Sequence, residues 1–207
     1  LSLRGTNFSA ALPDLIRCIG SLNYLNLGYC QIFGVIPESV GNLSRLTELF
    51  LDGNYLRGKI PDKFSISQKI SSLSLRRNLL SGNISISLLN LTHLDLLDLS
   101  SSQLSGSIPP SIFTIPTLSY LYLSSNLFTG TNYLTPHLHS LDVSSNSVQG
   151  PMPPSICNSS LLTILDLSNN NLSGPIPQCL GNSSWFLKIM DLGNNRHFGT
   201  YCCILVV

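Results

Sequence analysis

The stretch Leu162-Thr-Ile-Leu-Asp-Leu-Ser-Asn-Asn-Asn-Leu-Ser-Gly-Pro-Ile-Pro177 decides the fold of this chain. Its pattern is L-x-x-L-x-L-x-x-N-x-L-x-G-x-I-P, where x is any residue. The same spaced positions recur along almost all of the 207 residues. In six further copies the asparagine position is held by Cys30, Asn54, Asn78, Ser102, Asn126 and Asn146. A partial copy around Thr6 opens the chain and a degraded copy around Asn195 closes it, which makes nine.

The copies follow a period of 24 residues, which Pro13, Pro37 and Pro61 mark. One repeat is short, because Asn126 and Asn146 are only 20 residues apart, and we expect the curve of the chain to tighten there. Such a period is the sequence sign of a leucine-rich-repeat solenoid. We predict an α/β-type repeat solenoid, a right-handed superhelix of about nine repeats, which forms a single elongated domain over residues 1–207.

Each part of the repeat has a structural reason. Alternation in Leu-x-Leu indicates a short strand with one buried face, and nine stacked repeats predict a parallel sheet on the concave side. The convex side is expected to hold loops and 3-10 turns. The asparagine offers an acceptor and a donor to backbone groups at the following turn. Thr6, Cys30 and Ser102, which replace it, are small and can also form hydrogen bonds, and we expect Cys30 to be a buried thiol.

The composition excludes several classes of partner. Charged residues make up 10% of the chain and the net charge is +1, so there is no basic field for nucleic acid. We predict no cofactor. The sequence shows no signal peptide, no membrane span and no terminal caps, and its longest apolar run, residues 202–207, is too short to cross a bilayer. We therefore expect a fragment or a truncated product of a longer solenoid.

The sequence contains several N-x-S/T motifs. A glycosylated, extracellular protein is the expectation that these sequons support together, although some of them can be unmodified turn asparagines. They are Asn7, Asn42, Asn83, Asn90, Asn158, Asn171 and Asn182. Cys157 and Cys179 lie in the back segments of consecutive repeats, and stacked repeats are close enough for a disulfide. The alternative is two buried thiols.

The x positions of each strand should form the exposed concave face. Large aromatic and charged residues concentrate there between Tyr24 and Tyr122, which is the chemistry of a peptide- or protein-binding surface. The predicted binding residues are Tyr24, Tyr29, Glu48, Phe50, Asp52, Arg76, Arg77, Tyr120 and Tyr122. Arg76 and Arg77 could clamp a carboxylate. The alternative is that these charges pair with one another across neighbouring strands.

Two phrases, Gly34-Val-Ile-Pro-Glu-Ser-Val-Gly-Asn-Leu43 and Leu165-Asp-Leu-Ser-Asn-Asn-Asn-Leu-Ser-Gly174, resemble the plant-specific class of extracellular leucine-rich repeats. The chain is similar to plant receptor-like proteins of the disease-resistance type. The resemblance implies the ectodomain of a membrane-anchored immune or signalling receptor in the apoplast, which binds microbial or endogenous ligands and signals through partner kinases. The closing repeat departs from the pattern, since His197 stands where Leu or Phe should pack, and we expect distortion there.

The sequence leaves other functional classes to consider: an inhibitor protein, a receptor kinase and an enzyme. The chain also resembles the secreted polygalacturonase-inhibiting proteins and the ectodomains of leucine-rich-repeat receptor kinases. An enzyme is disfavoured, because its candidate carboxylates (Asp98, Asp142, Asp166 and Asp191) recur at one repeat position, which a structural role explains. His137 and His139 could suggest a metal, but no third ligand is near them in the sequence, so we predict no metal site.

Overall fold

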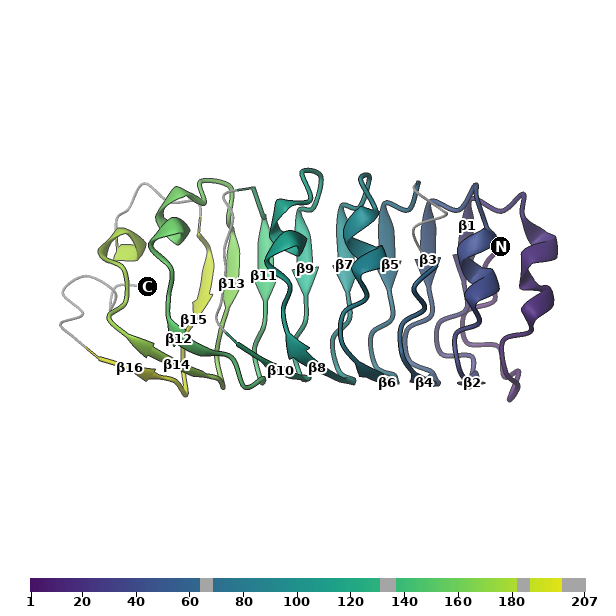
Figure 1. Ribbon diagram of the computed structural model, residues 1–207, viewed down its shortest axis with the longest axis horizontal. Coiled ribbons are helices and arrows are strands. Elements are labelled where there is room, and N and C mark those ends of the chain that lie inside the picture. Colours follow the sequence, from purple (N-terminus) through teal and green to yellow (C-terminus); the bar gives the residue numbers. More distant parts are fainter. Residues whose placement is uncertain (64–68, 131–136, 182–186, 199–207) are drawn as a thin grey trace.

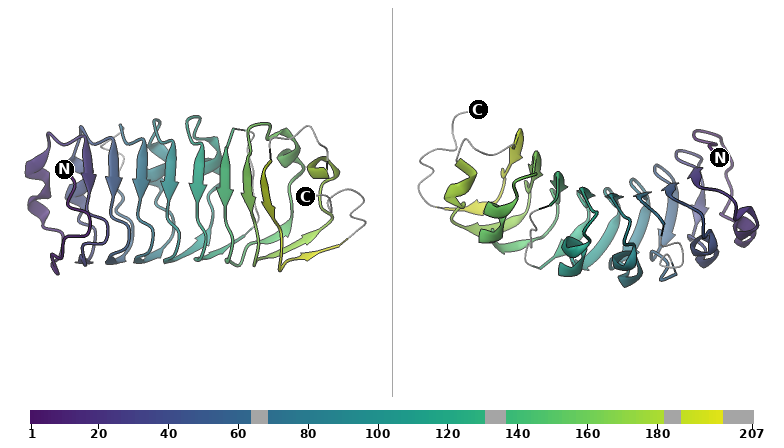
Figure 2. Two further views of the ribbon diagram at one scale, coloured as in Figure 1. Left: turned by 180° about the vertical axis from the view of Figure 1, so that it is seen from behind. Right: turned by 90° about the horizontal axis from the view of Figure 1, so that it is seen from above.

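The computed structural model describes residues 1–63, 69–130, 137–181 and 187–198. The repeats stack side by side in chain order along one axis (Figure 1). Viewed from above, the stack is an arc with one set of strands along its inner side and short helices along its outer side (Figure 2). The predicted leucine-rich-repeat solenoid is therefore confirmed.

The concave face is a parallel sheet in which every strand has three residues. Its eight strands pair in chain order: β1 (Tyr24–Asn26), β3 (Glu48–Phe50), β5 (Ser72–Ser74), β7 (Leu96–Asp98), β9 (Tyr120–Tyr122), β11 (Ser140–Asp142), β13 (Ile164–Asp166) and β15 (Ile189–Asp191). The middle residues, such as Leu25, Leu49 and Leu73, are in register and buried. Of the nine expected strands one is missing, because the first repeat contributes only the bridge from Ser2 to Asn26.

The convex side carries short 3-10 helices, as predicted. They are η1 (Asp14–Ile19), η2 (Glu38–Asn42), η4 (Ile86–Asn90), η5 (Pro110–Thr114), η6 (Pro154–Asn158) and η7 (Gln178–Gly181). A proline precedes most of them, since its fixed φ suits the residue before the first turn. Where Ser85 replaces proline, its hydroxyl instead accepts a hydrogen bond from the backbone N–H of Ser87.

A second layer of strands, which the sequence did not predict, follows the ladder positions, whether these hold Asn, Cys30 or Ser102. One lateral sheet holds β2 (Phe33–Gly34), β4 (Tyr55–Gly58), β6 (Leu79–Gly82), β8 (Gln103–Ser107) and β10 (Leu127–Thr129). The other holds β12 (Gln149–Pro151), β14 (Asn171–Gly174) and β16 (Arg196–His197). The two lateral sheets separate at the short repeat, whereas the concave sheet continues through it with Tyr120 paired to Ser140.

The asparagine ladder ties neighbouring repeats together. The Oδ1 atom of Asn54 accepts hydrogen bonds from the backbone N–H groups of Cys30 and Ile32, and its Nδ2 donates to the carbonyls of Leu27 and Leu51. Five later asparagines likewise accept a bond from one backbone N–H of the preceding repeat and donate to one of its carbonyls: Asn78, Asn126, Asn146, Asn170 and Asn195. Each satisfies backbone groups that turn away from the sheet.

The closing repeat is regular as far as the structure describes it. The Asn195 amide donates to the carbonyls of Leu167 and Leu192, and His197 lies beside Gly174 in β14. The expected distortion was therefore wrong for residues 187–198, because the ladder asparagine sets the turn whatever side chain follows it.

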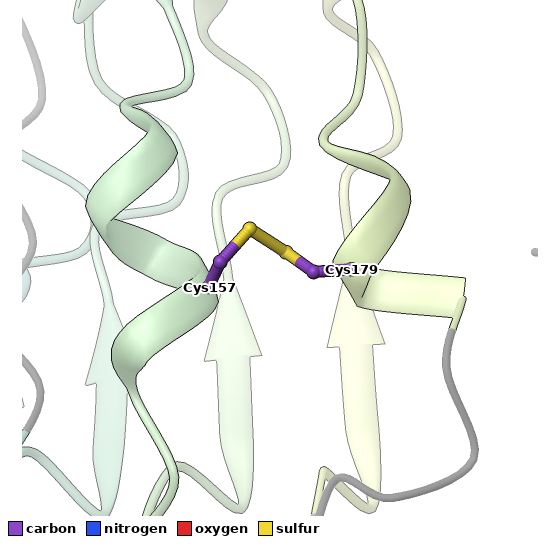
Figure 3. The surroundings of a disulfide bond; sticks show 2 residues. All are labelled: Cys157 and Cys179. Atoms are coloured by element: carbon purple, nitrogen blue, oxygen red, sulfur yellow. A yellow bond between two sulfur atoms is a disulfide. The ribbon is translucent and has the colours of Figure 1, made fainter.

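The cysteines fall into two groups. Cys157 and Cys179 form a disulfide between η6 and η7, with their Cα atoms 5.6 Å apart (Figure 3). This bond cross-links two consecutive repeats on the convex side. Cys30 is a buried thiol whose Sγ donates to the carbonyl of Leu3, and Cys18 is an exposed thiol. Cys202 and Cys203 lie outside the described residues.

Candidate functional site

The predicted binding residues all lie on the concave strands or on the turns that follow them. Tyr24, Glu48, Phe50, Tyr120 and Tyr122 occupy strands β1, β3 and β9. Tyr29, Asp52, Arg76 and Arg77 come from the turns after β1, β3 and β5, where backbone hydrogen bonds continue the register of the sheet. The fold brings Tyr29, Asp52 and Arg77 of the turns together with one another or with a shared neighbour, whereas the strand residues form contacts of their own.

A basic–aromatic cluster, made of Arg4, Tyr29, Asp52, Arg76 and Arg77, spans four repeats. The Arg4 Nη1 atom donates to both carboxylate oxygens of Asp52, at 3.2 and 3.1 Å. The Arg4 guanidinium also stacks over the Tyr29 ring, 4.6 Å from its centroid, which adds a cation–π attraction. Arg77 donates to the Tyr29 hydroxyl at 3.4 Å. Arg76 and Arg77 remain exposed to an incoming ligand.

Two glycines make this cluster geometrically feasible. A Cβ atom on Gly28 would lie 2.6 Å from Arg4 Nη1 and 2.8 Å from Asp52 Oδ1, so only glycine lets these side chains meet across the strand. A Cβ on Gly53 would lie 2.6 Å from the Tyr29 ring, and Gly53 has a φ of +67° as well. The ring therefore lies flat over Gly53 and reaches Arg77.

The role of Asp52 as a ligand contact stays a prediction, and its carboxylate is paired within the protein. Asp52 is only 9% exposed, because Arg4 covers it and pairs with it. The sequence reasoning missed Arg4, although a signal was present. Leu3-Arg4-Gly5 of the partial first repeat matches Leu27-Gly28-Tyr29, so Arg4 holds one of the variable x positions.

The remaining aromatic residues form separate contacts. The rings of Tyr24 and Phe50 are 5.8 Å apart, and Asn26 donates to the Tyr24 hydroxyl. Tyr120 stacks against His139, with ring centroids 6.0 Å apart. These contacts hold the rings in fixed positions on the face, which lowers the entropy lost when a ligand packs on them.

The C-terminal half of the face carries an acidic row: Asp98, Asp142, Asp166 and Asp191. The Oδ1 atom of each accepts a hydrogen bond from a backbone N–H two residues later, those of Ser100, Ser144, Ser168 and Gly193. Turn formation thus explains why aspartate recurs at this position. Burial raises the pKa of Asp98, while its hydrogen bonds to Ser100 and the nearby Arg76 partly oppose the rise.

We expect the substitution Asp98→Asn to stabilise the protein more at pH 7 than at about pH 3.5. A raised folded-state pKa means that Asp98 contributes stability below its unfolded pKa, near 3.8, and that this contribution is lost as the pH rises through the folded value. Asparagine keeps the acceptor for Ser100 and cannot ionise. Urea denaturation at both pH values measures the difference, and a gap that widens on acidification contradicts the prediction.

The part of the chain that the structure describes holds neither a metal-binding cluster nor a membrane-spanning helix. Across residues 1–63, 69–130, 137–181 and 187–198, no group of three or more His, Cys, Asp or Glu residues could hold a metal ion. His139 is engaged with Tyr120 instead. In the same described part of the chain, no helix has the length and apolarity needed to cross a membrane.

Comparison with known proteins identifies the family. The Leucine Rich Repeat profile matches residues 21–43, 45–65, 90–115, 137–159 and 161–183, more than half of the chain. The chain belongs to the leucine-rich-repeat family. No curated relative matches it.

Solved structures narrow the resemblance to plant receptors. The ectodomain of the Arabidopsis thaliana membrane receptor kinase GASSHO1/SCHENGEN3, in complex with CASPARIAN STRIP INTEGRITY FACTOR 2, is 31% identical over 94% of this chain, with a TM-score of 0.88. A TDR receptor is 32% identical over 91%, with a TM-score of 0.83. The Arabidopsis receptor kinase HAESA, with the peptide hormone IDA and the co-receptor SERK1, is 31% identical over 95%, with a TM-score of 0.78.

These comparisons confirm the resemblance to plant extracellular leucine-rich-repeat receptors. The chain spans only 24%, 37% and 38% of the three structures. Two of the three structures contain a bound partner, and the HAESA complex includes the co-receptor SERK1. The fold that the chain shares with them is typically non-catalytic.

Proposed function

We propose that this chain is a ligand-recognition ectodomain of a plant cell-surface immune or signalling receptor, which binds a peptide or protein on its concave face. The exposed pair Arg76 and Arg77, beside the fixed ring of Tyr29, is the observation that carries the proposal. Arginine and tyrosine are the residues most enriched at binding hot spots. The receptors of similar fold, which were crystallised with peptide ligands and a co-receptor, support it.

The size and surface of the face suit an extended peptide. Eight strands about 4.8 Å apart span roughly 34 Å, which is the length of about ten extended residues. Among the described sequons, Asn42, Asn90 and Asn158 end the convex helices η2, η4 and η6, and none lies on a concave strand. Glycans at these positions would leave the concave face open, as an extracellular receptor requires.

The test uses the glycosylated chain immobilised and exposed to plant apoplastic fluid that contains microbial secretions. The variant Arg76→Ser, Arg77→Ser, Tyr120→Ser should bind the captured partner at least about 100-fold more weakly, because charge-assisted bonds contribute roughly 1.5–3 kcal/mol each. The matched control removes the same residue types outside the concave strands: Arg57→Ser and Tyr55→Ser in β4, and Arg45→Ser in the turn before β3.

The outcomes separate the functional classes. A partner that the control retains and the concave variant loses supports recognition on this face. Equal loss from both variants contradicts it. Capture of a polygalacturonase would favour the alternative of an inhibitor-like secreted protein. The ectodomain of a leucine-rich-repeat receptor kinase remains a second alternative. The sequence of the parent protein would distinguish it, because only a receptor kinase carries a kinase domain.

A further inference from the structure

A polar groove lies on the lateral sheet formed by β12, β14 and β16. It encloses about 370 Å³ and is lined by Gln149, Gly150, Asn171, Ser173 and Arg196. The groove is separate from the concave face. Two of its lining residues, Asn171 and Ser173, are the first and third residues of a sequon.

The register of the three strands brings the polar side chains together. Gln149 is paired with Asn171 across β12 and β14, and Ser173 is paired with Arg196 across β14 and β16. Asn171 and Ser173 are two residues apart on one strand, so their side chains stand on the same face. Gly150 also lines the groove, between Gln149 and Pro151 of β12.

These polar side chains have no partners of their own within the described residues. Those of Gln149, Asn171, Ser173 and Arg196 form no hydrogen bond or ion pair there. The equivalent positions of the other lateral sheet hold a mixture of residues: Tyr55, Leu79 and Leu127 are apolar or aromatic, and Gln103, Arg57 and Ser81 are polar. Together these four side chains can offer both donors and acceptors to a polar occupant of the groove.

We propose that this groove seats the first N-acetylglucosamine of an N-glycan attached to Asn171. In the attachment, Asn171 Nδ2 bonds to C1 of the sugar, which is carried by a lipid pyrophosphate donor. The C1–O bond to the pyrophosphate breaks, the lipid pyrophosphate leaves with the bonding electrons, and the amide loses a proton. Arg196 and Gln149 then donate to the acetamido carbonyl and ring hydroxyls of the attached sugar.

Three of the other described sequons provide the contrast. Asn42, Asn90 and Asn158 are exposed at the ends of convex 3-10 helices, whereas Asn171 is half-buried in the central strand of its sheet. A glycan on Asn158 therefore projects into solvent, and a glycan on Asn171 begins against the protein. This inference concerns the lateral face and is independent of the ligand on the concave face.

The experiment expresses the chain in a glycosylating plant or insect host and removes glycans from the folded protein with peptide-N-glycosidase. Site-resolved mass spectrometry follows Asn171 and Asn158 over time. Release from Asn171 should be about tenfold slower, because one or two hydrogen bonds shield its first sugar. In the variant Gln149→Ala, Arg196→Ala the two rates should converge. Both replaced residues are exposed, so the fold should persist.

Two outcomes would overturn the proposal. One is an unmodified Asn171 on protein whose Asn158 carries a glycan. The other is equal release from both sites in the parent chain. A parallel titration of the unglycosylated chain with N,N′-diacetylchitobiose separates the sources of the sugar. Binding there, together with an unmodified Asn171, would show that the groove takes a free saccharide and not the attached glycan.

Discussion

Replacement of Asn54 by leucine should lower the free energy of unfolding by about 3–5 kcal/mol, since two buried backbone donors lose their acceptor. Those donors are the N–H groups of Cys30 and Ile32, each 2.9–3.0 Å from Asn54 Oδ1. The carbonyls of Leu27 and Leu51 lose the amide that donates to them. Leucine has a similar volume, so the effect isolates the hydrogen bonds. Urea denaturation followed by circular dichroism measures it.

An exposed asparagine provides the control. Asn23→Leu changes the same chemistry at the surface and should alter stability by no more than about 0.5 kcal/mol. The converse change uses Ser102, whose buried hydroxyl has no partner in the structure. Ser102→Asn should stabilise the chain by about 1 kcal/mol, as it adds the missing ladder bonds. Equal effects of Asn54→Leu and Asn23→Leu would contradict the ladder argument.

The sequence predicts the concave sheet and the ladder because both features need the same residue type at the same position of every repeat. Leu25, Leu49 and Leu73 must be apolar to pack, and the ladder asparagine must offer a donor and an acceptor. The lateral strands could not be predicted in this way. Their outward residues, such as Phe33, Arg57 and Ser81, share neither polarity nor size, since any side chain is tolerated at a position that faces solvent.

The basic–aromatic cluster shows why site geometry was harder to predict than fold. The spacing placed Tyr29, Arg76 and Arg77 on one face, and that was correct. It did not reveal that Arg4 covers Asp52, because the contact depends on the empty space above Gly28 and Gly53. A glycine at a variable position of the repeat, such as Gly28 or Gly53, does not by itself indicate which side chain will fill the space above it. The variable positions of the partial first repeat were the only guide to Arg4.

Replacement of Phe128 by alanine should cost about 3–5 kcal/mol and should uncouple the two ends of the solenoid. Phe128 is fully buried at the short repeat, where the lateral sheets separate. The buried ring adds apolar packing to the hydrogen bonds that cross this junction, which include the β9–β11 pairing, the bond from Phe128 N–H to Asn146, and the bonds from Ser147 N–H to the Phe128 carbonyl and from Gln149 N–H to the Gly130 carbonyl. The cavity that alanine leaves at position 128 should weaken the packing between the repeats before and after the short repeat.

Hydrogen exchange measured by mass spectrometry resolves this uncoupling. Amides of residues 137–181 should exchange at least about 100-fold faster in Phe128→Ala than in the parent, because an interface term of a few kcal/mol is lost. Phe128→Leu should cost only about 1–1.5 kcal/mol, since Leu56, Leu80, Leu104 and Leu172 hold the same position in other repeats. The exposed Phe33 provides a Phe→Ala control. If exchange accelerated equally in all repeats, the short repeat would not be the weak junction, and the solenoid would open as one cooperative unit.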